Sequence, residues 1–493
     1  MWARPFKLLA LSLGGVIALV ASIAIGRAVQ FESRQVSVAD TDSIPVPETA
    51  AQRLARAIEF RTITKREPTA LDSAAYRGLY RYLETAYPVV HDSLDVTRVN
   101  DLSRLYTWRG ADPSTAPIVL MAHVDVVPVE PGTRGDWTHP PFEGVVADSA
   151  VWGRGALDDK ASAIGLFEAL SLLVEGEGRP ERTVHVALGH DEEVGGPRGA
   201  RAIADRITEQ GQAPAIVVDE GGAITKGALP GLDRPLAVVG VAEKGYLSIE
   251  LRAEAPGGHS SAPPDSTSIE ILNAALSRLL DNPLDSRLDG VTGRMLEYVG
   301  PETEWPMQLA LANRWLTAPG IKWALNRKPA TKAAIRTVQV PTRLDAGVKD
   351  NVVPSSARAT INYRILPSQS VDEVLTHVRE TINPLPVTIE TGQTSEPTPV
   401  SEVGGKPFRV LQRTVGEVTS DSVVVAPYLV PGATDSRHYA EATRHVYRFL
   451  PYTLTPEDRG RIHGTNERIS ITDYRTLIRF YVQLLRNSDD LPT

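Results

Sequence analysis

The first half of the chain alternates short apolar runs with segments of helical periodicity. Residues 117–122, 183–188 and 215–218 are rich in Val, Ile and Leu, as expected for strands that are buried on both faces. Between these runs, residues 160–174 and 199–208 repeat apolar positions at helical spacing. This order predicts an α/β sheet that is covered by helices.

The pattern changes after about Glu243, where apolar and polar residues begin to alternate. Residues 246–253, 357–366 and 387–391 have the alternation that is typical of a sheet with one solvated face. Helical patterns lie among these runs, which indicates an α+β segment. We therefore expect a second domain in this part of the chain.

The second domain is expected to be an insertion, because α/β-like sequence returns after it. We place the inserted domain at residues 244–397 and the two parts of the first domain at residues 48–243 and 398–493. The first domain is expected to end in a helix over residues 471–485. The predicted fold is thus α/β, with a mixed sheet interrupted by a smaller α+β domain.

The N-terminus carries an apolar run that is long enough to cross a membrane. Arg4 and Lys7 precede the run, which covers residues 8–26 and comes close to the roughly 20 residues that a spanning helix needs. Residues 1–27 are therefore a signal anchor or a cleaved signal peptide, and the length favours the anchor. Positive charge ahead of the run predicts that the body is exported. Residues 28–47 are expected to form a linker.

Composition narrows the classes of function. The 493 residues exceed what one core holds, so two or three domains are expected. A net charge of -8 without a long basic run argues against a nucleic-acid partner. Cysteine is absent, which excludes disulfides and every thiolate metal site, so a bound metal must use His, Asp and Glu.

Residue types that bind metals follow three of the predicted strands, and a further pair opens the helix near residue 160. Taken alone, each has an ordinary interpretation, such as a helix N-cap for Asp158 or a solvated loop for Glu192. Together they predict one site, because the carboxyl ends of strands in an open α/β sheet share one rim. Imidazole and carboxylate ligands favour Zn²⁺, with Mn²⁺ or Co²⁺ as alternatives. The candidates are His123, Asp125, Asp158, Glu192, Glu193 and Asp219.

The motifs around these residues resemble those of the M20 metallopeptidases. They are His-x-Asp-x-Val-Pro at 123–128, Gly-Arg-Gly-Ala-x-Asp-Asp-Lys at 153–160, Asp-Glu-Glu-x-Gly-Gly at 191–196 and a late histidine at 463. The resemblance covers roughly residues 50–490 in the family's order. It implies a zinc-exopeptidase-like catalytic domain and gives the inserted domain the role of a lid and dimerisation domain.

The resemblance also implies a role for each candidate. Two zinc ions are expected to share Asp158 as a bridging ligand. The terminal ligands are expected to be His123, Glu193, Asp219 and His463. Asp125 is expected to hold the His123 ring in its metal-binding tautomer. Glu192 is expected to act as the general base.

Further candidates bind the substrate. The family segment that matches Gly257–Ser261 carries a histidine, here His259, which stabilises the oxyanion and often reaches over from a partner subunit. Asn351 and Arg364 match lid positions that hold the substrate, and Arg364 suits a free carboxylate. Gly432 is expected to offer backbone to the substrate. Arg437 is a competing carboxylate clamp or a structural ion pair.

These roles predict hydrolysis of an amide bond next to a free amino-acid carboxylate. The substrate is expected to be a small peptide, as for a carboxypeptidase or dipeptidase. The alternative is a hydrolase/synthase that acts on long-chain N-acyl amino acids. A catalytically inactive metal-binding homologue is a third interpretation. The enzyme is expected to work outside the cytoplasm, attached to a membrane through its N-terminal segment, and to form a homodimer through the lid.

Residues 302–326 combine Trp305, Trp315 and Trp323 with several aliphatic residues. The expected structure is a pair of helices that packs on its own lid domain. The alternative is an apolar entrance for a long acyl chain or a contact with the membrane surface.

Overall fold

In the computed structural model, the catalytic half of the chain is built around one large mixed sheet. The structure describes residues 3–38, 41, 43–65, 71–209, 211–227, 229–419 and 423–492. The large sheet has the order β1-β2-β6-β3-β7-β17-β9-β8-β18, and β16 pairs with β9. These strands are β1 (Asp95–Val99), β2 (Ser103–Trp108), β3 (Ile118–His123), β6 (Val184–Gly189), β7 (Ile216–Asp219), β8 (Ile224–Thr225), β9 (Leu236–Glu243), β16 (Val424–Val430), β17 (Val446–Arg448) and β18 (Thr453–Leu454).

Helices cover the large sheet, as the sequence predicts. They are α2 (Ala50–Ile58), α3 (Ser73–Ala86), α4 (Pro88–Ser93), α5 (Lys160–Gly176), α6 (Ala200–Thr208), α13 (Lys406–Val418), α14 (Pro456–Arg459) and α15 (Ile471–Arg486). The α5 helix is buried over most of its length because α2, α4 and α15 pack around it. A separate small sheet joins β4 (Val145–Ala147), β5 (Ala150–Trp152) and β19 (Arg468–Ser470).

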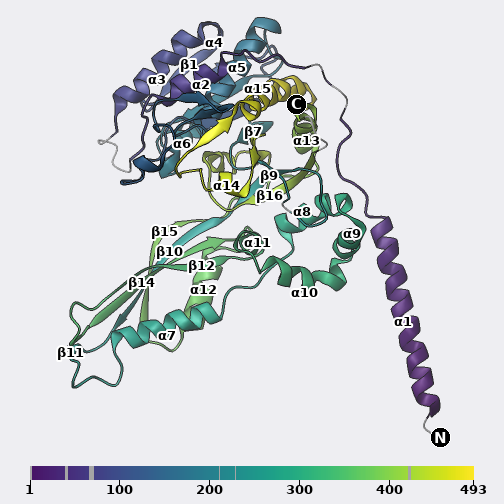
Figure 1. Ribbon diagram of the computed structural model, residues 1–493, viewed down its shortest axis with the longest axis vertical. Helices are drawn as coiled ribbons and strands as arrows, with labels where there is room; N and C mark the ends of the chain where they lie inside the picture. Colours follow the sequence, from purple (N-terminus) through teal and green to yellow (C-terminus); the bar gives the residue numbers. More distant parts are fainter. Residues whose placement is uncertain are drawn as a thin grey trace.

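The inserted segment forms an antiparallel sheet that extends away from the large one (Figure 1). This lid sheet has the order β12-β14-β10-β15. Its strands are β10 (Gly245–Glu254), β12 (Val338–Ala346), β14 (Ser356–Ile365) and β15 (Val387–Ser395). A separate pair of antiparallel strands, β11 (Gly258–His259) and β13 (Val352–Val353), lies at its tip. Burial alternates along β10 and β14, which confirms the predicted single solvated face. The helices α7 (Ser268–Asp281) and α12 (Val371–Ile382) cover the other face.

The tryptophan-rich segment forms a pair of helices, as expected, and the pair contacts other helices of the inserted segment. The pair is present as α9 (Trp305–Ala312) and α10 (Arg314–Leu325), followed by α11 (Pro329–Ile335). However, α9 packs against α1 and α8 (Gly290–Val299), and α8 packs against β16 of the large sheet. Because α8 and α11 belong to residues 244–397, the pair packs within the inserted segment, on helices next to the large sheet and not on the lid sheet. Leu311 and Val299 turn inward here, whereas the three tryptophans are exposed.

The apolar N-terminal run forms one long helix, α1 (Ala3–Val29). Within the described residues, Leu11–Val29 is long and apolar enough to cross a membrane, and almost none of it is buried against the protein. Figure 1 shows α1 projecting from the body beside α9. Length and composition are compatible with both an anchor and a signal peptide.

Candidate metal centre

Three neighbouring strands bring the predicted ligands to one rim of the large sheet. The central strand β3 pairs in parallel with β6 on one side and β7 on the other. It ends at His123, β7 ends at Asp219, and a short 3-10 turn at Glu192–Val194 follows β6. The predicted convergence at the carboxyl ends of the strands is therefore confirmed.

A first group of metal-ligand atoms lies around His123. Its members are His123, Asp158 and Glu220, and one ligand atom of each lies within 4.8 Å of the others. His123 Nε2 is 2.8 Å from Asp158 Oδ1 and 3.5 Å from Glu220 Oε1. A histidine between two carboxylates is a donor set that suits a divalent transition metal.

A second group lies on the other side of Asp158. His463 Nε2 is 3.0 Å from Asp158 Oδ2 and 3.2 Å from Glu193 Oε2. Asp158 thus belongs to both groups and presents a different oxygen to each. This is the arrangement by which one carboxylate joins two metal sites.

The structure brings Glu220 to the first group, where the sequence analysis expects Asp219. Asp219 is buried at the end of β7, and its Oδ2 accepts a hydrogen bond of 2.8 Å from the backbone N–H of Ser436. The strand ends at Asp219 and the chain bends at Glu220, and it is the Glu220 carboxylate that reaches His123. Among the described residues, Asp219 lies in neither metal group.

Asp125 fastens two parts of the site together. Its side chain is fully buried, and its Oδ1 lies 3.3 Å from His123 Nδ1. The two carboxylate oxygens also accept the backbone N–H groups of Glu192 and Glu193, each at 3.2 Å. One carboxylate therefore orients both the His123 ring and the turn that carries the two glutamates, in keeping with its expected supporting role.

The expected base, Glu192, lies within the electrostatic reach of both groups. Burial raises its pKa well above the usual value, and the charges of His123, Glu220 and Asp158 act on it as well. Burial and repulsion from Asp158 likewise raise the pKa of Glu220 to about 8. The hydrogen bonds that the His463 ring donates to the carboxylates of Asp158 and Glu193 raise its pKa to about 10. Burial is thus the main cause of the raised pKa values of the two glutamates, and the neighbouring carboxylates add to the shifts of all three groups.

The residues at the rim fit a pair of divalent cations. Positive charge between the carboxylates would relieve their repulsion. Within the described part of the chain, the buried Oε1 of Glu193 has no hydrogen-bond partner. A buried carboxylate oxygen without a donor is a free position for a metal bond. The donors are oxygen and imidazole nitrogen throughout, which excludes metals that require thiolate.

A buried ion pair that the sequence analysis did not identify fixes the relative positions of two ligands. Glu467 Oε1 accepts the backbone N–H groups of Gly155, Leu157 and Asp158 at 2.9–3.2 Å. Its Oε2 pairs with Arg154, whose Nη2 donates to the carbonyl of His463 at 3.0 Å. Asp158 and His463 are far apart in the chain, and this pair joins their backbones in addition to the direct contact of their side chains. The sequence gives no signal for the pair of Arg154 and Glu467, because the two residues lie in distant segments of the chain.

Two of the expected substrate-binding residues lie far from the metal groups in this chain. His259 is exposed on β11, and its Nδ1 accepts a hydrogen bond from Ser261 N–H. Asn351 lies beside it, since its carbonyl accepts the N–H of Ser260. Figure 1 shows β11 at the tip of the lid sheet, remote from the rim at β7.

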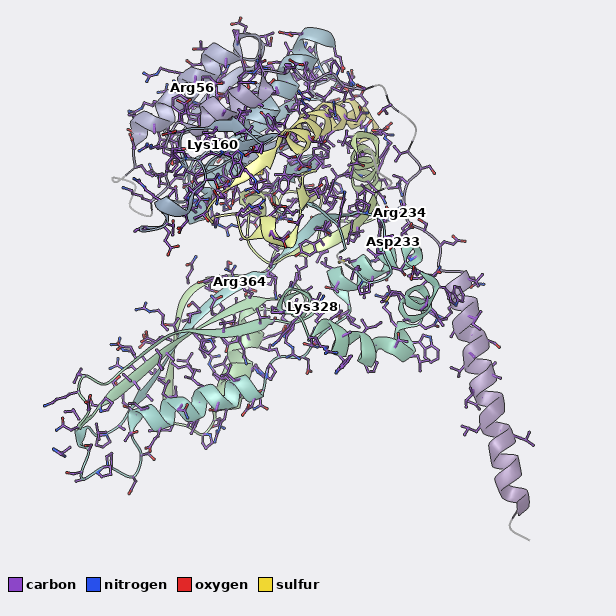
Figure 2. All side chains as sticks on the ribbon, viewed as in Figure 1. Arg56, Lys160, Asp233, Arg234, Lys328 and Arg364 are labelled. Carbon is purple, nitrogen blue, oxygen red and sulfur yellow. The ribbon has the colours of Figure 1, made fainter. Side chains whose placement is uncertain are left out.

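The other substrate-binding candidates lie nearer. Figure 2 shows Arg364 at the end of the lid sheet that faces the large sheet, and its guanidinium lies 4.8 Å from the centroid of the Tyr246 ring. A side chain at Gly432 would meet nothing within 4 Å, so open space adjoins its backbone. Arg437 donates to the carbonyl of Gly195 at 2.6 Å, which ties it to the turn after Glu193. Arg437 therefore already supports the site's backbone.

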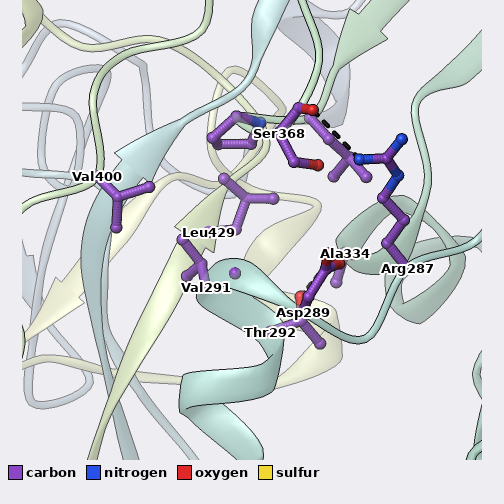
Figure 3. Close-up of a pocket in the computed structure, with 11 residues that line it drawn as sticks. Arg287, Asp289, Val291, Thr292, Ala334, Ser368, Val400 and Leu429 are labelled. Atoms are coloured by element: carbon purple, nitrogen blue, oxygen red, sulfur yellow. Dashed lines mark hydrogen bonds between the residues drawn. The ribbon is translucent and has the colours of Figure 1, made fainter.

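A cavity of about 100 Å³ lies at the base of the insertion (Figure 3). Val291, Leu366 and Leu429 contribute to its apolar lining, and Arg287 donates to the carbonyl of Ser368 at its edge. The residues that line it are distinct from those of both metal groups. The cavity lies between the start of α8, the end of β14 and the strand β16.

The contacts of Glu467 predict its effect on metal binding. The exchange Glu467→Gln replaces one acceptor oxygen by an amide donor, so the loop before Asp158 and the Arg154 contact both loosen. We expect the affinity for Co²⁺ to fall about 10- to 100-fold, as measured by titration of the visible absorption of bound cobalt. Glu168→Gln is the matched control, because Glu168 is also buried and paired with an arginine, Arg53. Equal losses in both variants would contradict a specific role for Glu467.

Comparison with known proteins gives the family. The model of the peptidase family M20/M25/M40 matches residues 119–487. The N-fatty-acyl-amino acid synthase/hydrolase PM20D1 of Xenopus tropicalis is 38% identical over 445 residues, which are 89% of this chain and 85% of that protein. A probable carboxypeptidase S-like 2 of Dictyostelium discoideum is 38% identical, with the same coverage of 89% and 85%.

The fold agrees with this relationship. The M20 family metallo-carboxypeptidase Sso-CP2 of Sulfolobus solfataricus superimposes with a TM-score of 0.63, and the match covers 89% of this chain and 99% of that one at 18% identity. The family model extends over most of the chain and includes the strands that carry the rim. The chain is therefore an enzyme of the M20/M25/M40 family of metallopeptidases.

Proposed function

We propose that this enzyme hydrolyses an amide bond next to a free amino-acid carboxylate at a centre of two zinc ions. The observation that carries the proposal is Asp158, which presents one oxygen to His123 and the other to His463. We assign His123 and Glu220 to one ion, Glu193 and His463 to the other, and Asp158 to both. A pair of such ions supplies Lewis acidity toward a carbonyl oxygen and toward water.

Glu192 is proposed as the proton carrier. Its raised pKa matches a group that takes a proton from water and later gives it to the leaving amine nitrogen. Its neighbour Glu193 faces His463, so the two adjacent glutamates divide metal binding and proton transfer between them. Asp125 keeps both in place through their backbone N–H groups.

Substrate orientation is assigned to the segment that joins the two sheets. We propose residues 244–397 as the lid and the parts 48–243 and 398–493 as the catalytic domain. Arg364 is placed to bind the free carboxylate of the substrate with its planar fork of donors. The open space at Gly432 leaves its backbone available to the substrate.

A homodimer would explain the position of His259. Because His259 and Asn351 lie at the tip of the lid, they do not reach the rim of their own chain (Figure 1). We propose that the lids of two chains pair and that each provides its His259 to the partner's site. There the imidazole would donate a hydrogen bond to the oxygen of the tetrahedral intermediate.

On the acyl side, a small peptide is the first candidate, in line with the carboxypeptidase S-like relative. A long-chain N-acyl amino acid is the second, and it is favoured by the PM20D1 relative and by the exposed apolar helix α10. We further propose that α1 anchors the enzyme in a membrane and that residues 28–47 link it to an extracytoplasmic body. The charge ahead of α1 supports this orientation.

The exchange Glu192→Gln tests the base. It removes the proton acceptor but keeps the shape of the side chain, so kcat should fall by roughly 10²–10⁴-fold while the metals remain bound. Steady-state kinetics gives kcat. Elemental analysis should still give about two metal ions per chain. The exposed Glu209→Gln serves as the control. A Glu192→Gln enzyme that retains full kcat would exclude this residue as the base.

A substrate panel tests the carboxylate grip and separates the two candidates. Dipeptides and N-acyl amino acids of increasing chain length are each compared with their C-terminal amides. We expect kcat/KM to be about 10- to 100-fold higher for the free acids, since a charge-assisted pair contributes about 1.5–3 kcal/mol, and Arg364→Ala should abolish this preference. If Arg437→Ala abolishes it instead, the assignment is overturned. A rise of kcat/KM with acyl length favours the second candidate, and a preference for dipeptides favours the first.

A further inference from the structure

The exposed face of α10 is apolar, which reverses the usual orientation of a surface helix. The exposed positions recur in adjacent pairs every four residues, so they form one stripe along the helix. This α10 stripe consists of Trp315, Leu316, Pro319, Gly320, Trp323 and Ala324. Trp315 and Trp323 are 55% and 66% exposed. The charged residues Arg314 and Lys322 lie off the stripe, on partly buried positions. Helices that face water normally show the opposite pattern.

The helix α10 begins where the apolar helix α1 meets the body of the protein. The Asn313 side chain donates to the carbonyl of Ala24 at 2.9 Å, and Arg27 donates to the carbonyl of Ala312 at 3.4 Å. Ala24 precedes the end of the apolar span at Val29 by five residues, or roughly 7 Å at 1.5 Å per residue. If α1 spans a bilayer, the start of α10 therefore lies at the boundary between acyl chains and headgroups.

The basic residues in and after α10 favour binding to a surface of negative charge. The segment 313–336 contains six basic residues and no acidic one, although the whole chain has a net charge of -8. The basic residues are Arg314, Lys322, Arg327, Lys328, Lys332 and Arg336. Tryptophan and basic side chains on one short helix are typical of segments that lie in a membrane interface.

The junction between α1 and α10 adds a pocket of about 540 Å³ that is lined by Arg27, Arg314 and Trp315, among others. Glu297 also lines it and pairs with Arg314 at 3.0 Å. The same carboxylate pairs with Arg34 and Arg294, each at 3.4 Å, so the basic charges here exceed the acidic one. Guanidinium groups in such a pocket suit the phosphate of a lipid headgroup.

We propose that the α10 stripe lies in the leaflet from which α1 emerges, as a second membrane contact of the enzyme. Its occupant is the phospholipid bilayer, because α10 begins at the end of the apolar span of α1 and carries both exposed tryptophans and basic residues. This inference rests on the proposed role of α1 as an anchor. With two contacts, the body is held in a fixed orientation on the membrane surface.

The absence of cysteine allows a direct test on the full chain. Trp315→Cys and Trp323→Cys are each labelled with an environment-sensitive fluorophore and reconstituted in vesicles of phosphatidylcholine and phosphatidylserine. The control is Val96→Cys, at an apolar position that is also exposed (43%) on β1, which lies on the opposite side of the body from α1 in Figure 1. We expect blue-shifted emission at positions 315 and 323, and at least twofold stronger quenching by nitroxide-labelled lipids than at position 96. Quenching should weaken when phosphatidylserine is omitted.

Flotation of the same samples tests the membrane anchor α1 separately from the contact of α10. If the protein floats with the vesicles but both helix labels remain water-exposed and unquenched, the α10 contact is overturned and the anchor stands. If the protein does not float, the anchor fails and the contact fails with it. If the blue shift increases with protein density and lipid quenching is absent, the stripe binds a second copy of the chain. That result would contradict the proposal.

Discussion

The chemistry of this enzyme depends on a group of carboxylates that the fold forces together against their mutual repulsion. Asp125, Asp158, Glu193 and Glu220 meet two histidines at the ends of three parallel strands. Burial and repulsion from Asp158 raise the pKa of Glu220 to about 8, and divalent cations between the carboxylates would offset this repulsion. The site therefore carries more negative charge than its own residues balance, which favours the binding of cations. Its geometry is rigid because backbone N–H groups and the Arg154–Glu467 pair hold the ligand loops in place.

The large sheet and the inserted segment carry different functional residues. The large sheet holds the metal groups, whereas the lid sheet begins at β10, directly after β9 of the large sheet, and carries Arg364 near this junction and His259 at its far tip. The cavity at the junction leaves the two sheets incompletely packed there. The proposed dimer rests on this geometry, because a lid that reaches outward from its own rim would need a second chain to bring His259 to a metal centre.

Much of this arrangement could be predicted from the sequence because periodicity and strand ends obey simple rules. Three buried runs, each followed by a ligand type, located His123, Glu193 and the end of β7, and alternation located the lid strands. The rules could not separate Asp219 from Glu220, since both follow the same strand and only the local backbone decides which side chain faces the rim. Glu467 was missed because its partners lie some 310 residues away in the chain. The contact of α9 with α1 was not predicted, because packing between two helices leaves no periodic signal in the sequence.

The most direct test of the central claim is a crystal structure of the zinc-loaded enzyme with anomalous diffraction recorded at the zinc edge. Two peaks should appear, both bonded to Asp158 at about 2.0–2.2 Å, one also to His123 and Glu220 and the other to Glu193 and His463. A single peak, or two peaks that do not share Asp158, would contradict the two-metal centre from which the proposed reaction is derived.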